Sequence, residues 1–160
     1  NGFTVTAVRQ TAGALAGFAV SGTGGSGMSL PSSFTFSGVS EEDVVGIAST
    51  VLTTSPYPGA SPTGSVVTFD LTSNGEALSV SGLSEPLVIT LASGSGRCAF
   101  YDTTTSSWST VGLTTVVSGS TIRCYSTHLT AFGSFASSAA TVAISAVVVV
   151  LAALVQLVLA

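Results

Sequence analysis

Residues 67–80 read VTFDLTSNGEALSV, and this stretch decides the fold class. Apolar and polar side chains alternate from Val67 to Leu71, as expected for a β-strand with one buried face. Asn74-Gly75 follows, and this pair favours a tight hairpin because both residues tolerate a positive φ angle. A second β-prone run, Ala77–Val80, then leads the chain back. The stretch therefore predicts an antiparallel β-hairpin.

Short β-prone runs separated by turn residues continue on both sides of this hairpin. The downstream runs are Pro86–Leu91, Cys98–Tyr101, Trp108–Val111, Thr121–Tyr125 and Leu129–Phe132. Residues 1–64 are rich in Gly, Ser and Thr, but their regular Val, Phe and Ile content argues against a disordered linker. We expect an all-β protein, an antiparallel β-sandwich that begins in residues 1–64 and continues through residues 65–135.

The last twenty residues, 141–160, differ from the rest of the chain. They read TVAISAVVVVLAALVQLVLA, in which the polar side chains are Thr141, Ser145 and Gln156. A helix of this length spans about 30 Å, the thickness of the hydrocarbon core of a bilayer. A buried core helix is the alternative, but it would carry a polar stripe that this segment lacks. We expect a membrane-inserting helix, joined to the sandwich by a juxtamembrane linker over residues 136–140.

The kind of membrane attachment stays open. No Lys or Arg flanks the apolar segment, so the positive-inside rule gives no orientation. The segment fits a transmembrane helix, a tail anchor or a lipid-anchor signal; for the last, small residues precede it but the polar spacer is short. We favour a single-pass transmembrane helix. The β-sandwich would then be extracellular at the cell membrane, with membrane lipid as a partner.

The charge balance excludes several classes of function. The 160 residues carry three Lys and Arg against seven Asp and Glu, for a net charge of -4. No basic cluster could neutralise a phosphate backbone, so we expect no nucleic-acid partner. Two Cys and one His without paired C-x-x-C spacing cannot supply four ligands, so we expect no metal site. We expect no cofactor, since Gly22–Gly27 lacks the Lys-Ser/Thr ending of a phosphate loop.

The two cysteines, Cys98 and Cys124, lie in separate β-prone runs before the apolar tail. On the extracellular side of a membrane a disulfide is the expected state, and it would close a loop worth roughly 3–4 kcal/mol in the chain-entropy model. Two independent buried thiols are the alternative.

The single histidine, His128, stands in His128-Leu129-Thr130. A lone histidine in a β-protein is usually structural or exposed, so the tripeptide alone is weak evidence. Its context is more specific, because it closes a longer pattern. In order, the pattern is Cys98-Ala99-Phe100-Tyr101-Asp102, Trp108 with Gly112 four residues on, Cys124, and His128-Leu129-Thr130-Ala131-Phe132.

This order and spacing resemble the GPS motif within the GAIN domain of adhesion receptors and polycystin-like proteins. The resemblance covers residues 98–132 and implies that the sandwich is the membrane-proximal β-subdomain of that domain. The helical subdomain that usually precedes it is not recognisable. The family commonly carries four cysteines, bridged first to third and second to fourth. Leu113 and Ser126 stand at the second and fourth positions, so one bridge is lost and the resemblance implies the pair Cys98–Cys124.

The resemblance also implies autoproteolysis between Leu129 and Thr130. His128 would act as general base on the Thr130 hydroxyl, which would attack the Leu129 carbonyl, and water would hydrolyse the resulting ester. Side chains two residues apart along a strand share a face, so we expect His128 and Thr130 on one side. Strain at a tight bend would assist the attack. This is at most a single turnover in cis, not a turnover enzyme.

The C-terminal product would begin at Thr130 and stay associated without a covalent link, with Phe132 and Phe135 as its apolar anchors. We therefore expect a self-processing segment of a receptor or polycystin-like membrane protein, whose extracellular ligand the sequence does not identify. An uncleaved adhesive or structural β-module is one alternative. The start of a polycystin-like channel, with residues 142–159 as its first helix, is another. Phe100, Tyr101 and Trp108 are expected in the core, and Asp102 in a turn.

Overall fold

The fold is seen in a computed structural model of the chain, which describes residues 2–92 and 96–136. Within these residues the chain forms strands β1–β12 and two short 3₁₀ helices, η1 (Ala12–Leu15) and η2 (Thr23–Gly25). All strand pairs are antiparallel. The predicted all-β class is confirmed.

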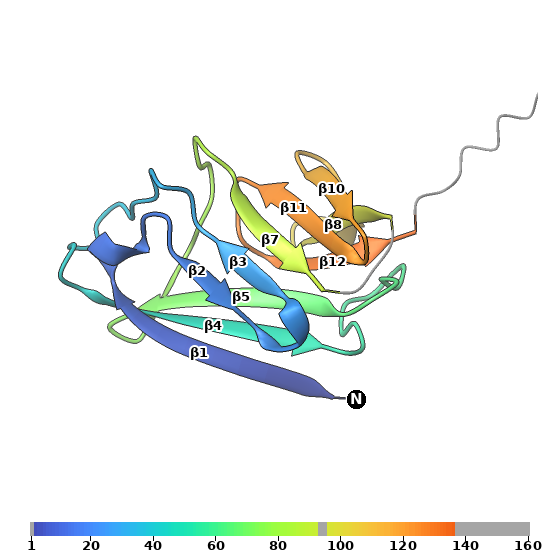
Figure 1. The fold of residues 1–160 in the computed structure, drawn as a ribbon, viewed down its shortest axis with the longest axis horizontal. Coiled ribbons are helices and arrows are strands. Elements are labelled where there is room, and N and C mark those ends of the chain that lie inside the picture. The colour runs from blue at the N-terminus through green and yellow to red at the C-terminus, as the bar shows by residue number, and fades with distance from the viewer. Residues whose placement is uncertain (1, 93–95, 137–160) are drawn as a thin grey trace, which may run out of the picture.

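The strands form two sheets that face each other (Figure 1). The first sheet contains β1 (Phe3–Thr11), β4 (Val44–Leu52), β5 (Val66–Ser73), β6 (Glu76–Leu78), β8 (Arg97–Asp102), β9 (Ser107–Ser109) and β12 (Ala131–Phe135). The second contains β2 (Ala19–Ser21), β3 (Gly27–Ser29), β7 (Leu87–Leu91), β10 (Thr114–Ser118) and β11 (Thr121–Ser126).

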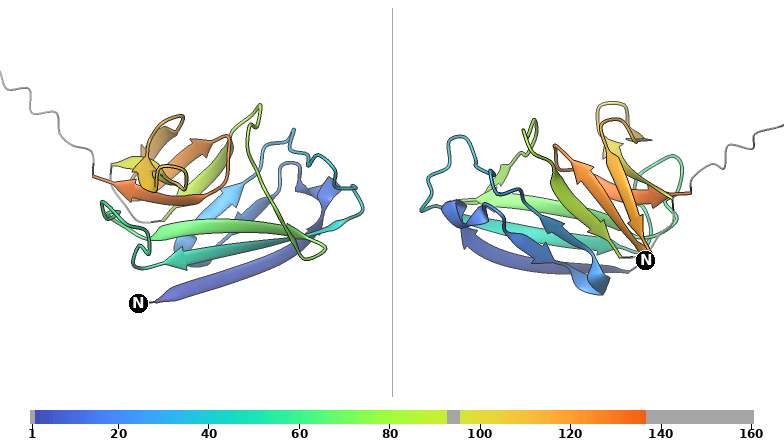
Figure 2. Two further views of the ribbon diagram at one scale, coloured as in Figure 1. Left: turned by 180° about the vertical axis from the view of Figure 1, so that it is seen from behind. Right: turned by 45° about the horizontal axis from the view of Figure 1, so that its top comes forward.

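Strand order places the C-terminal strand inside its sheet. The first sheet has the order β1-β4-β5-β12-β8-β9, with β6 paired to β5, and the second has the order β10-β11-β7-β3-β2. β12 therefore lies between β5 and β8, while β1 forms an outer edge, as the views from two sides show (Figure 2).

The hairpin predicted over residues 67–80 is formed by β5 and β6. Asn74 and Gly75 connect the strands with φ angles of 52° and 84°, and Ser73 pairs with Glu76 on either side of them. Positive φ at both central residues gives a turn whose twist matches that of the strands. β6 ends at Leu78, so the returning strand is shorter than the predicted run.

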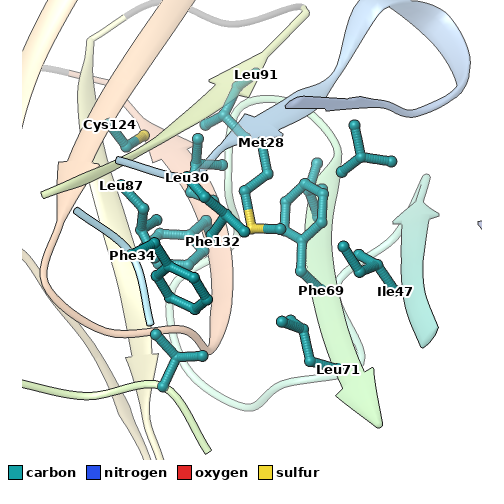
Figure 3. Packing of buried hydrophobic residues seen from close by; sticks show 14 of the residues in the cluster. Met28, Leu30, Phe34, Ile47, Phe69, Leu71, Leu87, Leu91, Cys124 and Phe132 are labelled. Carbon is teal, nitrogen blue, oxygen red and sulfur yellow. The ribbon is translucent and has the colours of Figure 1, made fainter. Parts of the chain in front are cut away.

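The main core fills the space between the sheets. Along β5 the side chains of Val67, Phe69 and Leu71 are buried, as the alternating pattern predicts. They meet residues of the second sheet, and Figure 3 shows Met28 of β3 directed toward Phe69. Phe132 of β12 is among the largest side chains with no exposed surface. Burying such a side chain contributes about 1.5–3 kcal/mol.

The predicted disulfide is confirmed. Cys98 of β8 is bonded to Cys124 of β11, so the bridge links the first sheet to the second. Both residues lie in the core with almost no exposed surface.

The predicted membrane helix is not seen. Across residues 2–92 and 96–136 no helix is both long enough and apolar enough to span a bilayer. The predicted helix at 141–160 and the linker beyond residue 136 lie outside the described residues, so this part of the predicted architecture stays a prediction.

Candidate functional site

The predicted cleavage site lies in the bend between β11 and β12. β11 ends at Ser126 and β12 begins at Ala131, so residues 127–130 carry the chain from the second sheet to the first. The strand predicted over Leu129–Phe132 therefore starts two residues later. The bend forms because the chain must change sheets within four residues.

Main-chain hydrogen bonds tie this bend to the segment that follows β6. The amide of Leu129 donates to the Val80 carbonyl oxygen at 2.9 Å. The amide of Leu83 donates to the Thr127 carbonyl oxygen at 3.1 Å. The residue on the amino side of the predicted cut is thus held in place by its own amide.

The imidazole of His128 packs in an apolar setting beside one hydroxyl group. Its ring meets the Phe100 ring edge to face with centroids 4.4 Å apart, and the Phe132 ring centroid lies at 6.2 Å. Nδ1 lies 3.3 Å from Ser126 Oγ. Nε2 is buried and has no hydrogen-bond partner among residues 2–92 and 96–136.

This setting keeps the His128 ring neutral near pH 7. Burial lowers the pKa of His128 below its ordinary value of 6.5, and the Asp102 carboxylate offsets that shift by a smaller amount. A neutral imidazole with a free ring nitrogen can accept a proton, as a general base must.

Thr130 is held by a different group. Its Oγ1 donates a hydrogen bond of 2.8 Å to the main-chain oxygen of Tyr101. In the described part of the chain no hydrogen bond joins His128 to Thr130. The prediction that the two side chains share a face assumed strand geometry, and that assumption is wrong because residues 127–130 form a bend.

A cavity of about 370 Å³ opens beside the predicted scissile bond. Leu129, Thr130 and Ala131 form one side of it, and the other lining includes Tyr57 and Asp70. Burial raises the pKa of Tyr57 above 10.0, with the Asp70 carboxylate adding to the shift. The cavity offers room for water next to the bond.

The other motif residues lie in or near β8, β9 and β12. Phe100 is half-buried and lies opposite Phe132 in the sheet, and Phe132 is fully buried. Tyr101 and Trp108 pair across β8 and β9, but they pack in a second, smaller cluster outside the main core. Gly112 lies in an exposed turn with a φ angle of 75°.

Asp102 lies where the sequence predicts a turn. Its carboxylate accepts hydrogen bonds from the Thr104 amide at 2.8 Å and the Thr105 hydroxyl at 3.0 Å. These bonds, the Thr104 amide first, hold the pKa of Asp102 below 3.8. The predicted turn role is confirmed, and the side chain keeps its negative charge near His128.

The loop between β4 and β5, residues 53–65, covers the outer side of β12, and we call it the covering loop. Tyr57 stacks on the Tyr101 ring at 4.4 Å between centroids. The Thr63 amide donates to the Ser134 carbonyl oxygen at 2.7 Å. The sequence does not reveal the stacking contact, because nothing local links Tyr57 to a ring 44 positions away in the chain.

Sequence reasoning also missed two groups that hold the predicted catalytic residues. The first group is the Ser126 hydroxyl. The sequence marks Ser126 as the position of a missing cysteine, and a hydroxyl two residues before a histidine was the signal that could have indicated a contact. The Tyr101 carbonyl oxygen could not be found, since main-chain partners leave no mark in a sequence.

Comparison with known proteins gives one result. A family model described as GPS, GAIN subdomain B, matches residues 20–139, which is more than half of the chain. The matched region contains β3 to β12 and the whole bend. No curated protein matches the chain.

Proposed function

The chain belongs to the GPS family of GAIN subdomain B, and from this premise we propose that it cuts itself between Leu129 and Thr130. The observation that carries the proposal is the buried Nε2 of His128, which has no partner in the described part of the chain and belongs to a residue two positions before a threonine. A base of this kind can activate an alcohol for nucleophilic attack on a carbonyl once the two groups meet.

The first step transfers an acyl group from nitrogen to oxygen. The Thr130 hydroxyl loses its proton to the His128 imidazole as Oγ1 bonds to the carbonyl carbon of Leu129. The bond between that carbon and the Thr130 nitrogen then breaks, and the imidazolium returns the proton to the nitrogen. The products are a free amine and an ester.

The second step consumes one water molecule. Water adds to the ester carbonyl carbon, the bond to Thr130 Oγ1 breaks, and a Leu129 carboxyl group and a Thr130 hydroxyl are formed. The 370 Å³ cavity bordered by Leu129 and Thr130 provides a route for that water. His128 ends in its starting state, although the chain has reacted only once.

The hydrogen bond from Thr130 to Tyr101 must open before attack. In the structure the hydroxyl proton points to the Tyr101 oxygen rather than to an imidazole. Rotation of the Thr130 side chain would exchange one acceptor for the other. The proposed reaction therefore starts from a minor rotamer, and its rate depends on how often that rotamer is reached.

The C-terminal product would remain bound as part of the sheet. β12 pairs with both β5 and β8 at Phe132, and its pairing with β8 continues to Phe135. All of these contacts lie after residue 130. We place the uncut chain at a cell surface, with residues 1–135 outside the membrane and residues 141–160 inserted in lipid, on the strength of the apolar tail.

Cleavage is tested by expressing the full chain in a secretory host and separating it on a denaturing gel. We expect two pieces from the parent, with Thr130 as a new N-terminus by mass spectrometry. Thr130→Ala and His128→Ala should each give one intact chain. Thr127→Ala, an exposed threonine in the same bend, is the matched control and should cleave as the parent does. Folded parent protein that stays intact would refute the proposal.

One observation favours a second function, an uncleaved adhesive or structural β-module. The Thr130 hydroxyl is already satisfied by the Tyr101 oxygen, and no hydrogen bond in the described residues leads from it to His128. A chain that never left this state would keep the motif without using it. The intact parent band described above is the result that this alternative predicts.

A further inference from the structure

Ser126 has an unusual relation to the histidine two residues later. Its side chain is buried, with 1% of its surface exposed. Within the described residues, all three polar contacts of its Oγ are with His128: 2.8 Å to the main-chain oxygen, 3.2 Å to the main-chain amide and 3.3 Å to Nδ1. A hydroxyl has one donor and two acceptor sites, so these contacts use its full capacity.

The direction of each bond follows from counting protons. The His128 main-chain oxygen can only accept, so the single hydroxyl proton of Ser126 is committed to it at 2.8 Å. The His128 amide can only donate, and it takes one lone pair of Oγ. The contact with Nδ1 is then a hydrogen bond only if Nδ1 carries the proton.

From this geometry we infer that Ser126 is a positioning residue that fixes the His128 ring as the Nδ1–H tautomer and so keeps Nε2 unprotonated for the reaction. The inference rests on the proposed function for its purpose, but the tautomer itself is a property of the folded chain. A histidine with Nε2–H would present a donor where the reaction needs an acceptor.

The other neighbours of the ring cannot fix the tautomer. Phe100 and Phe132 touch it with aromatic faces and edges and offer no conventional hydrogen-bond acceptor. Asp102 acts on the ring through its charge, and its carboxylate is already engaged by Thr104 and Thr105. In the described residues the Ser126 hydroxyl is the one group that hydrogen-bonds to the imidazole.

Because the second cysteine pair is absent, position 126 can carry a serine that hydrogen-bonds to His128. The resemblance to the family places a bridged cysteine at position 126, and a bridged sulfur carries no proton to give to the His128 oxygen. Serine at this position supplies both the donor and the acceptors. The hydroxyl therefore adds a local constraint at a place where the covalent constraint is missing.

The test measures the tautomer directly in the full chain with ¹⁵N-labelled histidine. Since His128 is the only histidine, its two ring nitrogens can be assigned by NMR without ambiguity. The measurement uses a Thr130→Ala background, so that the chain stays uncut and the readout does not depend on cleavage. We expect Nδ1–H in this background and a shift toward Nε2–H when Ser126→Ala is added.

Cleavage rates provide the second readout, in the chain with Thr130 restored. Ser126→Ala should slow cleavage about tenfold, the effect expected from losing one orienting hydrogen bond. Ser126→Thr keeps a hydroxyl and should restore most of both the rate and the tautomer. Ser49→Ala is the matched control, because Ser49 is equally buried and its hydroxyl has no hydrogen-bond partner among the residues that the structure describes.

The outcomes separate the two proposals. Nε2–H in the uncut background, or a tautomer unchanged by Ser126→Ala, would overturn the positioning role whatever the rate shows. A parent that never cleaves but loses Nδ1–H on Ser126→Ala would refute the proposed function and support the positioning role. Equal slowing by Ser126→Ala and Ser49→Ala, with no change of tautomer, would show that only packing is involved and would overturn the inference.

Discussion

β12 and the bend before it are adjacent in sequence but are held in different ways. β12 lies inside a sheet, paired with β5 and β8, and it buries Phe132 completely. The bend at residues 127–130 is held by two main-chain hydrogen bonds to the Val80–Leu83 segment and by the hydroxyls of Ser126 and Thr130. One region is fixed by packing and the other by a few directional contacts.

The contrast shows why a cut at this place need not release the strand. The peptide bond between residues 129 and 130 lies before the first paired residue of β12. Breaking it removes one covalent link and none of the strand's ladder hydrogen bonds. The following changes test the contrast, in order of decreasing effect on the free energy of unfolding.

We expect the largest loss of stability when the buried aromatic ring of β12 is removed. Phe132→Ala should lower the free energy of unfolding by about 3–5 kcal/mol, because the fully buried ring leaves a cavity between the sheets. Urea unfolding followed by tryptophan fluorescence measures the loss. Phe135→Ala is the matched control, since that ring is half-buried against Trp108, and it should cost clearly less. Equal losses would show that β12 is not held by the core.

The disulfide fixes β8, the strand beside β12, and we expect the second-largest loss of stability when it is removed. Replacing both Cys98 and Cys124 by Ala should cost roughly 3–4 kcal/mol, because the open loop gains entropy in the unfolded chain. Thermal unfolding of the variant beside the oxidised parent measures this. Both cysteines precede residue 129, so reduction alone should not free a cleaved C-terminal piece from folded protein. Release on reduction at native conditions would contradict our view of how β12 is held.

The outer side of β12 is tested at Gly133. A methyl group there would lie 3.0 Å from Pro62 Cγ, so that Pro62 in the covering loop would have to shift by a few tenths of an ångström. Gly133→Ala should therefore cost about 1–3 kcal/mol in unfolding experiments. At Gly2 a new methyl would meet nothing nearer than 3.7 Å, so Gly2→Ala is a suitable control. No loss at Gly133 would mean that the covering loop yields easily.

The bend should respond to pH rather than to packing. Because burial lowers the pKa of His128 below 6.5, the unfolded chain takes up the proton first as the pH falls below 6.5, and stability decreases there. Above that pH the imidazole is neutral in both states and has no effect. This loss of unfolding free energy should be smaller than those expected for Phe132→Ala, the disulfide and Gly133→Ala, since the ring is half-buried and partly screened.

Denaturant midpoints at pH 7.5 and pH 5.5 measure this effect. His128→Gln should remove the difference, because the chain has no other histidine. Asp102 does not interfere, as its pKa lies below 3.8 and its contribution is lost only at more acidic pH. A parent that becomes more stable at pH 5.5 would contradict the sign of the shift.

The sequence predicted those features that depend on local pattern. Alternation marked β5, Asn74-Gly75 marked the hairpin, and the motif order identified the family and the Cys98–Cys124 pair. These successes share a cause, because each rests on residues close in sequence or on a known spacing.

Features that depend on contacts between distant segments were missed. The start of β12 at Ala131 is set by where the chain crosses between sheets, which alternation in Leu129–Phe132 does not reveal. The covering loop depends on Tyr57 reaching Tyr101 across the outer face. The orientation of the Thr130 hydroxyl depends on its hydrogen bond to the Tyr101 carbonyl oxygen in β8. Each is decided by tertiary packing that overrides the local signal.

Because β12 lies inside the first sheet, its removal would leave that sheet in two parts. Without β12 the first sheet would divide into a block of β1, β4, β5 and β6 and a separate pair, β8 and β9. The pair would then stay attached through the Cys98–Cys124 bond, the hydrogen bond from the Cys98 amide to Thr115 Oγ1, and the packing of Tyr57 on Tyr101 and Trp108. Between the two blocks would lie a vacant slot with two unpaired edges, open to any extended segment of matching pattern.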